Sequence, residues 1–376
     1  MRVLYLTNNP NRGGTVRILQ SWFLYARTCG ITPVVAVTPG SKFAGWLRDN
    51  DVEFIENPMP LPSNTKPWES VWHAARLALW ARSHRVDLIH CNEHDVYRFA
   101  SVVRGFLRVP IVCHIRFTIS HPLAKWLFAG ARRPDFLLWT SNTQKSDCAD
   151  GIGEFVSEDR QAVVRLGFDL SWFGTRIHER GAIRRGWGLT PEQVAIGQCT
   201  ALRPRKRIED FIDVVAGVAA RHQHVVGILA GDAPPGDETY RAAVLRRIAA
   251  SDLGSRFRWL GNIEDVEPFC QGIDIFVSTS EYETFGNSVC EAMACGRPVV
   301  AYEGGSVKEV VGNSGSIVPT GDCAALIAAT EHLVAEPGRL HELGEAARER
   351  VRTEFDPRRS FEQLLDVYSR CTEVGR

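Results

Sequence analysis

The chain has 376 residues, of which 44% are apolar and 23% charged, and its formal net charge at pH 7 is zero. This is the composition of a globular protein, and it excludes a membrane-spanning chain because no run approaches 18 apolar residues. One hydrophobic core rarely serves so many residues, so two domains are expected.

Short β-branched runs alternate with helical segments along the chain, a pattern that predicts two doubly wound α/β halves. The first half is expected to contain strands at residues 3–6, 34–37, 52–55, 87–91, 111–115 and 136–140. The second half is expected to contain strands at residues 194–199, 225–229, 257–260, 273–277, 298–301 and 316–318. The join falls near residues 164–173, and residues 361–368 are expected to form a final helix.

The first predicted strand runs into a turn that contains Gly13 and Gly14, followed by a helix with apolar positions Val16, Leu19 and Phe23. Two glycines let backbone N–H groups approach an anion closely, although a plain helix-entry loop has the same sequence features. The turn lacks the Gly-x-Gly-x-x-Gly pattern, which argues against a dinucleotide-dependent dehydrogenase.

Polar residues follow two further strands of the first half. Asn92 and Asp95 lie just beyond the strand at 87–91, where ligands of open α/β sheets bind. His114 lies at the exit of the strand at 111–115. A lone histidine in such a place is more often structural than catalytic.

The loop after the strand at 194–199 concentrates four cations within five residues, namely Arg203, Arg205, Lys206 and Arg207. Such a concentration of fixed positive charge suits a phosphate or diphosphate group, which lysine and arginine can stabilise without a metal. A solvated basic loop is the alternative interpretation.

The most informative segment contains Glu283 and Glu291, which lie on either side of Phe285, Gly286 and Asn287. A short apolar strand precedes Glu283, and the helix that opens near Phe285 presents unpaired backbone N–H groups to phosphate oxygens. Glu291 lies one turn beyond Asn287 on the same helix face. Two solvated glutamates in an ordinary strand-helix-strand unit are the alternative.

This segment, with the Ala-Met-Ala-Cys-Gly-Arg-Pro-Val-Val-Ala run of residues 292–301, resembles the retaining glycosyltransferases of family four, which have the GT-B fold. The resemblance implies that Glu283 holds the hydroxyls of the donor sugar and that Glu291 holds the nucleotide ribose. It also implies that the backbone of Phe285, Gly286 and Asn287 binds the diphosphate.

The same resemblance extends along the chain. It implies that Gly13 and Gly14 lie near the donor diphosphate, that His114 lies against the donor sugar, and that backbone groups near Leu260 bind the base. Lys206 matches the family's lysine in the basic loop. Ala201 occupies the position of the family's arginine, and Arg203 is the nearest substitute.

The resemblance therefore predicts an α/β protein of GT-B architecture, with two Rossmann-like domains that face a central cleft. The expected domains are residues 1–168 for the acceptor and 169–356 for the nucleotide sugar, with 357–376 as a helix that returns to the first domain. Within the first domain, Asn92 and Asp95 are expected to contact the acceptor. The expected activity is metal-independent, retaining transfer from a UDP- or GDP-sugar to a glycan, lipid-linked or small-molecule acceptor, without a cofactor. The alternatives are a nucleotide-sugar epimerase or phosphorylase of the same fold, or an inactive sugar-nucleotide binding protein.

The location and further partners follow from the termini, the cysteines and the charges. The first strand begins within two residues of the N-terminus, which leaves no room for a signal peptide, and the ten cysteines form no Cys-x-x-Cys pair. A cytoplasmic protein with reduced thiols is therefore expected, without a nucleic-acid partner.

Residues 1–168 carry 20 Lys and Arg against 14 Asp and Glu. In this half, helical spacing separates Trp68, Trp72, Arg76 and Trp80, and the basic pair Arg132 and Arg133 follows Trp126, Leu127 and Phe128. Such faces suit an anionic interface, so peripheral contact with an anionic membrane is one hypothesis. A helix packed on the sheet edge and a chance division of charge are the alternatives.

Overall fold

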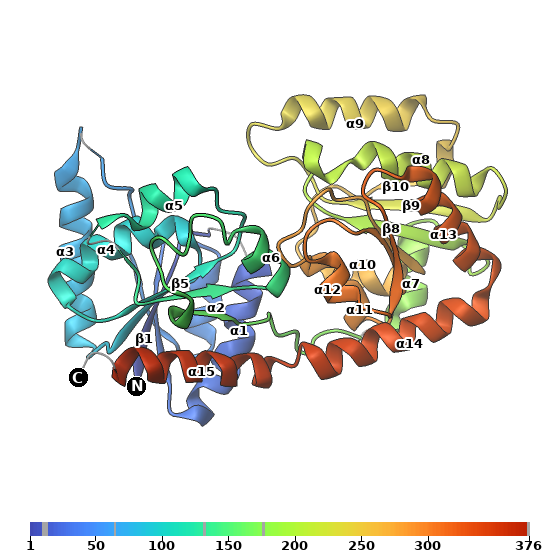
Figure 1. Ribbon diagram of the computed structural model, residues 1–376. Coiled ribbons are helices and arrows are strands. Elements are labelled where there is room, and N and C mark those ends of the chain that lie inside the picture. The colour runs from blue at the N-terminus through green and yellow to red at the C-terminus, as the bar shows by residue number, and fades with distance from the viewer. Residues whose placement is uncertain (10–13, 64, 131–132, 175–176, 374–376) are drawn as a thin grey trace. The chain divides into compact units, whose positions relative to one another are not determined.

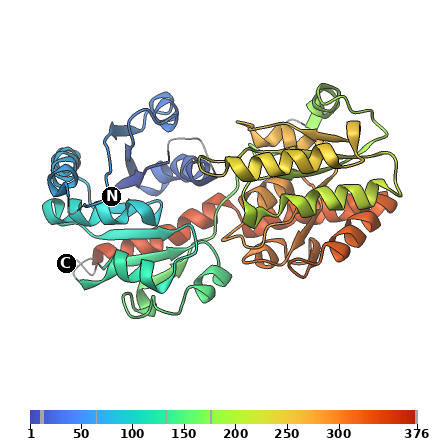
Figure 2. The ribbon, with the colours of Figure 1, turned by 90° about the horizontal axis from the view of Figure 1, so that it is seen from above.

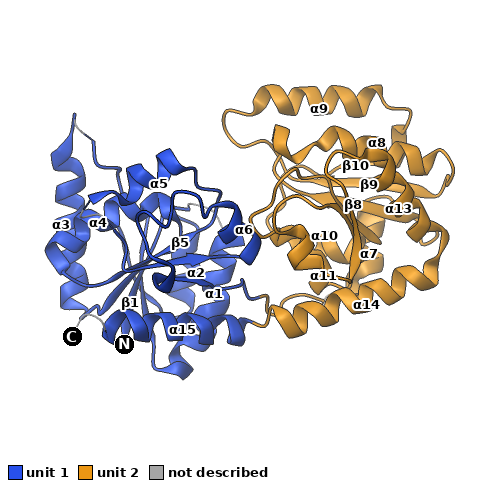
Figure 3. Cartoon of the chain, viewed as in Figure 1, with its two compact units in different colours: residues 1–167, 357–376 blue, residues 168–356 orange. Residues whose placement is uncertain are grey.

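The computed structural model describes residues 1–9, 14–63, 65–130, 133–174 and 177–373. The chain forms two compact units, which Figure 3 distinguishes by colour. Unit 1 comprises residues 1–167 and 357–376, and unit 2 comprises residues 168–356. Gly13, one of the expected donor-site residues, lies outside the described part of the chain.

Unit 1 contains a parallel sheet with the strand order β3-β2-β1-β4-β5-β6-β7. Its strands are β1 (Arg2–Thr7), β2 (Thr32–Val37), β3 (Glu53–Glu56), β4 (Leu88–Cys91), β5 (Ile111–Ile115), β6 (Phe136–Trp139) and β7 (Gln161–Val163). The six strands expected in this half are confirmed. The seventh strand, β7, was not expected from the sequence; it is short, it lies at the sheet edge, and its residues are only partly buried.

The helices of unit 1 are α1 (Gly14–Ala26), α2 (Phe43–Asp49), α3 (Pro67–Ser83), α4 (Tyr97–Leu107), α5 (His121–Phe128), α6 (Asn142–Asp147) and α15 (Pro357–Glu373). The chain returns from unit 2 through α15, which contacts α1 (Figure 1, Figure 2). Buried residues recur every three or four positions along α15, from Phe361 and Leu364 to Tyr368 and Cys371. This spacing gives the helix one apolar face, and the contact with α1 explains its burial.

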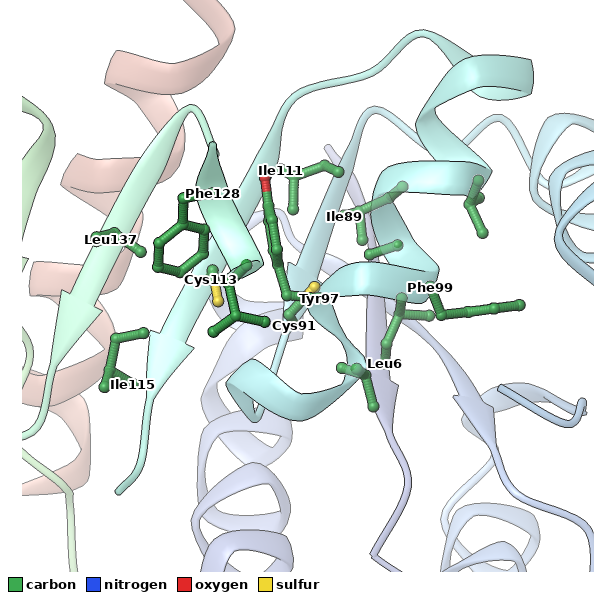
Figure 4. Close-up of a cluster of buried hydrophobic side chains, with 14 of the residues drawn as sticks. Leu6, Ile89, Cys91, Tyr97, Phe99, Ile111, Cys113, Ile115, Phe128 and Leu137 are labelled. Atoms are coloured by element: carbon green, nitrogen blue, oxygen red, sulfur yellow. The ribbon is translucent and has the colours of Figure 1, made fainter. Parts of the chain in front are cut away.

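A hydrophobic cluster fills one side of the unit 1 sheet (Figure 4). Successive side chains of a strand point to opposite faces, so Ile111, Cys113 and Ile115 of β5 enter this cluster together. Tyr97 of α4 and Phe128 of α5 cover them, and all five residues are fully buried. The alternation also sends the side chain of His114 to the other face of the sheet.

Unit 2 contains a second parallel sheet with the order β10-β9-β8-β11-β12-β13. Its strands are β8 (Val194–Cys199), β9 (Val225–Ala230), β10 (Phe257–Trp259), β11 (Ile275–Ser278), β12 (Val299–Tyr302) and β13 (Gly315–Val318). Its helices are α7 (Arg180–Gly186), α8 (Ile208–Ala219), α9 (Glu238–Ala250), α10 (Val266–Gly272), α11 (Asn287–Ala294), α12 (Val307–Val311), α13 (Cys323–Ala335) and α14 (Pro337–Glu354). The six strands expected in this half are confirmed.

The ten cysteines are all free thiols. Within the described ranges, no helix combines the length and apolar character needed to cross a membrane.

Candidate active site

The strand order of unit 2 reverses between β8 and β11. In open parallel sheets, ligands bind outside the carboxyl ends of the strands where the order reverses. The loop after β8 contains Lys206, and the loop after β11 contains Glu283. The two residues that the sequence analysis favoured most therefore leave neighbouring strands at the position where a ligand is expected.

Lys206 and Glu283 form an ion pair between Nζ and Oε1, with only 9% and 15% of their side chains exposed. Two hydrogen bonds to backbone carbonyls connect the loop after β8 with the loop after β11. The hydroxyl of Thr279 donates to the carbonyl of Lys206 at 2.7 Å, and the N–H of Glu281 donates to the carbonyl of Arg205 at 2.9 Å. The ammonium and the carboxylate are thus positioned before any ligand binds.

The other cations of the basic loop have different partners. Arg207 donates from Nε to Asp210 at 2.8 Å and from Nη1 to Glu281 at 3.2 Å, and these acids raise its pKa above the usual range. Arg203 pairs with Asp237 at 3.2 Å, and 44% of its side chain is exposed. Arg207 therefore stabilises the loop, whereas Arg203 stays accessible to a ligand.

A glycine turn holds the backbone of Glu283. The N–H of Glu283 donates to the carbonyl of Gly304 at 3.3 Å, and the N–H of Ser306 donates to the carbonyl of Glu283 at 2.8 Å. A Cβ atom at Gly305 would lie 2.3 Å from the carbonyl oxygen of Glu283, and Gly305 has a φ of +62°. Only glycine tolerates both conditions, so the turn at 304–305 determines where Glu283 lies.

Residues 285–287, which were expected to bind the diphosphate through their backbone, lie at the start of α11. Gly286 adopts a φ of +93° immediately before the helix, and Glu291 lies one turn into it with 6% of its surface exposed. The Phe285 ring is buried and stacks on Phe168, with ring centroids 5.9 Å apart. Phe285 can therefore serve a ligand through its backbone, whereas its side chain packs within unit 2.

A third loop of unit 2 contains Leu260, the expected base-binding position. The N–H of Leu260 donates to the carbonyl of Leu229 at 2.8 Å, so this N–H is already used within the sheet. Next to it, the N–H of Gly231 donates to Gly261 at 2.7 Å, and a Cβ atom at Gly231 would lie 1.8 Å from the Thr200 carbonyl oxygen. Gly231 thus lets the loops after β8 and β9 approach each other.

In unit 1 the strand order reverses between β1 and β4, and a buried polar network lies at their carboxyl ends. Asn92 donates from Nδ2 to Glu93 at 2.6 Å and accepts from Arg116 Nη2 at 2.8 Å. Asp95 is exposed and accepts a bond from Asn8 at 3.0 Å. Of the two expected acceptor residues, Asp95 is open to solvent and Asn92 is fully buried.

His114 is fully buried on the opposite side of the sheet from the hydrophobic cluster. Its ring stacks on Trp22 with a centroid separation of 6.0 Å, and neither ring nitrogen has a hydrogen-bond partner in the described part of the chain. Burial, followed by the charge of Arg116, lowers its pKa well below the usual value, so the imidazole is neutral. Its catalytic role stays a prediction.

The sequence analysis gave no role to Arg116, which is only 4% exposed and bonds Asn92 through two nitrogens. It also missed Thr279, whose hydroxyl anchors the Lys206 loop. Both residues directly follow a fully buried strand, β5 and β11 respectively. A polar residue at the carboxyl end of a buried parallel strand is the signal that could have identified them.

The buried carboxyl of Glu93 predicts a specific pH dependence of stability. Burial, reinforced by Asp95 and opposed by Arg116, raises its pKa to about 7. Because the folded pKa exceeds the unfolded value, the folded state holds the proton more tightly, and ionisation costs stability as pH rises through this interval. We expect Glu93→Gln to gain on the order of 2–3 kcal/mol in unfolding free energy relative to wild type between pH 5 and pH 8. Urea unfolding of wild type and Glu93→Gln between pH 5 and pH 8 tests this prediction. If the unfolding free energies of the two proteins change with pH in the same way, the prediction is contradicted.

Two family models match the chain. Residues 191–336 match Glycosyl transferases group 1, and residues 13–172 match Glycosyltransferase Family 4. A lipopolysaccharide core biosynthesis mannosyltransferase, LpcC, of Rhizobium leguminosarum bv. viciae is 27% identical over 305 residues, which cover 78% of this chain and 81% of the relative. An N-acetyl-alpha-D-glucosaminyl L-malate synthase of Bacillus anthracis is 23% identical over 234 residues, or 60% of each chain.

Among solved structures, Anabaena HepE in complex with UDP and glucose superimposes with a TM-score of 0.85 at 21% identity. The match covers 98% of this chain and 99% of that chain. At this level of identity the likeness establishes the fold, with two Rossmann-like units.

Proposed function

The chain belongs to the family-four glycosyltransferases, which have the GT-B fold, and from that premise we propose that it moves a sugar from a nucleotide-diphosphate sugar to an acceptor hydroxyl. The acceptor would be a glycan, a lipid-linked sugar or a small molecule. The observation that carries the proposal is the buried Lys206–Glu283 ion pair where the strand order of unit 2 reverses. The ammonium suits a departing diphosphate, and the carboxylate suits sugar hydroxyls.

In this proposal, different residues of unit 2 bind the sugar, the diphosphate and the ribose of the donor. Glu283 would accept hydrogen bonds from the sugar, and the first N–H groups of α11, from Asn287 onward, would bind diphosphate oxygens. Glu291, one turn further along α11, would bind the ribose. Lys206 and Arg203 would stabilise the negative charge that develops on the leaving phosphate.

We propose that transfer retains the configuration at the anomeric carbon. The bond from this carbon to the phosphate oxygen breaks, and a bond to the acceptor oxygen forms on the same face. The departing phosphate oxygen takes the proton of the acceptor hydroxyl. In this scheme the cations of the basic loop supply the positive charge, and no metal is assigned. NMR of the product's anomeric proton tests retention.

We propose a UDP- or GDP-sugar as donor and the cytoplasm as the location, where thiols such as the ten free cysteines stay reduced. HepE was solved with UDP and glucose, which makes UDP-glucose the first donor to test. Incubation with a panel of UDP-, GDP- and ADP-sugars should release the nucleoside diphosphate slowly from one of them, as measured by mass spectrometry. Donor binding without any turnover across an acceptor panel would instead identify an inactive binding protein. Conversion of the sugar without nucleotide release would identify an epimerase.

The two glutamates are expected to differ in kinetic effect. Glu283→Ala should mainly lower kcat, because contacts to the sugar matter most while its bond breaks. Glu291→Ala should mainly raise the donor KM, roughly ten-fold, which is the worth of a charged hydrogen bond made equally in the ground and transition states. Steady-state kinetics with varied donor separates the two effects. Equal changes in both constants for both variants would contradict this division of roles.

We also propose that α3 contacts anionic membranes. Its residues Trp68, Val71, Trp72 and Leu79 recur at helical spacing and are 44–66% exposed, which supports a single apolar face open to solvent. One element of the sequence-based hypothesis is wrong: Leu127 and Phe128 are fully buried in the core of unit 1, so they are not available to a membrane.

The double variant Trp68→Glu/Trp72→Glu should abolish sedimentation with anionic vesicles at low salt. The control, Ile177→Glu, changes an apolar residue of unit 2 that is also more than half exposed, and this variant should still sediment. Wild-type protein that fails to sediment, or that sediments equally with neutral vesicles, would contradict the proposal.

A further inference from the structure

A pocket of about 510 Å³ opens in unit 1 at the amino ends of its parallel strands. Asp135 precedes β6, Arg160 precedes β7, and Arg108 ends α4 just before β5. Asn92, Asp95 and Arg116 lie at the carboxyl ends of the strands, on the opposite edge of the same sheet. The pocket is therefore separate from the polar network at the reversal of the strand order.

Four arginines and two aspartates line this pocket, namely Arg104, Arg108, Arg160, Arg370, Asp135 and Asp159. The lining carries an excess of two positive charges. Cys371 adds no negative charge, because burial raises the pKa of its thiol to about 12. A ligand that neutralises this lining is a small dianion.

The side chains of two of these arginines, Arg104 and Arg370, already bind other groups of the protein. Arg104 forms an ion pair with Asp135 and donates to the carbonyl of Arg133 at 2.8 Å. Arg370 lies over the Phe136 ring at 4.8 Å and donates to the carbonyl of Asp159. These contacts fix the walls of the pocket.

The other two arginines are exposed and available. Their backbone N–H groups donate to the carbonyls of Arg104 and Ser157, but neither guanidinium group makes a hydrogen bond or ion pair with the residues that the structure describes. Arg108 also adopts a left-handed conformation with a φ of 58°, as does Arg85, which has a φ of 51° and does not line the pocket. The strained backbone is therefore no evidence of a ligand, and it makes Arg85 a matched control.

We propose that this pocket binds a phosphate monoester group through Arg108 and Arg160. Planar guanidinium groups donate two parallel hydrogen bonds to phosphate oxygens, and a monoester carries close to two negative charges at neutral pH. The volume suits a small molecule. Inorganic phosphate presents the same oxygens with a similar charge, so free phosphate and a sugar phosphate are the two sources that the test distinguishes.

Binding here would also connect separate parts of the fold. Arg370 belongs to the last turns of α15, whereas Arg108 ends α4 and Arg160 lies before β7. A phosphate bound by Arg108 and Arg160 would also attract the guanidinium of Arg370, which lines the same pocket, and would thus strengthen the attachment of the end of α15 to the sheet. Amide hydrogen exchange of residues 366–373 should therefore slow when the pocket is filled.

Calorimetric titration with inorganic phosphate and, separately, glucose 6-phosphate tests the proposal at fixed ionic strength. We expect saturable binding at submillimolar concentration, weakened at least ten-fold by Arg108→Ala and by Arg160→Ala, while transferase activity stays unchanged. Arg85→Ala should bind like wild type. Tighter binding of glucose 6-phosphate than of inorganic phosphate would support a sugar phosphate as the source, and equal binding would support recognition of the phosphate group alone.

Lys206→Ala separates this pocket from the donor site. It should leave phosphate binding intact, because Lys206 belongs to unit 2. Phosphate binding that is lost in Lys206→Ala but kept in Arg108→Ala and Arg160→Ala would overturn the proposal. An absence of saturable binding of either probe would also overturn it. Neither result would bear on the proposed transfer reaction.

Discussion

Replacing Lys206 by alanine is expected to lower kcat for sugar transfer on the order of 10²-fold, the typical cost of removing one preorganised donor at a developing anion. The side chain is 9% exposed and already paired with Glu283, so little reorganisation is needed when charge moves onto the leaving phosphate. Its removal also leaves the Glu283 carboxylate without its cation. Steady-state kinetics, with circular dichroism to verify folding, measures the effect.

Matched variants of the same loop show how many cations the reaction uses. Arg203→Ala should also cost on the order of 10²-fold if Arg203 supplies the charge that Ala201 does not. Arg205→Ala and Arg207→Ala should stay within a few-fold of wild type, since Arg207 is held by Asp210 and Glu281. If Lys206→Ala strongly lowers kcat while Arg203→Ala keeps a kcat near that of wild type, this loop supplies a single cation to the reaction. Arg203 would then serve only its ion pair with Asp237.

Gly305→Ala is expected to reduce kcat by at least as much as Glu283→Ala and to destabilise unit 2 by about 2–4 kcal/mol. The added Cβ would lie 2.3 Å from the Glu283 carbonyl oxygen, so either the turn or Glu283 must move. A displacement of about 1 Å is enough to cost catalysis on the order of 10²-fold. Kinetics and urea unfolding measure the two effects.

Gly321→Ala separates the clash from the backbone strain. Gly321 also belongs to unit 2 and has a φ of +87°, but a Cβ there would meet nothing within 4 Å. We expect this control to lose about 1 kcal/mol of stability with unchanged kinetics. If the two variants lose activity equally, the contact between Gly305 and Glu283 does not position the glutamate.

Much of the fold could be predicted from local pattern. The strands β1 and β8 are short, mostly apolar segments bounded by polar turns, and such segments need no knowledge of distant residues to be identified. The start of α11 was equally predictable, because Gly286 is a local signal for a change of backbone conformation. The strand β7 could not be predicted in this way, because three partly buried residues at a sheet edge are too few to give a clear hydrophobic pattern.

The alternation of strands and helices and the residue types at strand ends could be predicted from the sequence, because both depend on neighbours within a few positions. Which of these residues meet depends on the packing of distant segments. Lys206 and Glu283 are 77 positions apart, and they pair because β8 and β11 are neighbours in the sheet. His114 is similar: its position in β5 was readable, but its burial against Trp22 depends on how α1 packs on the sheet. Contacts between distant segments form only when the whole core packs, so the local sequence pattern does not predict them.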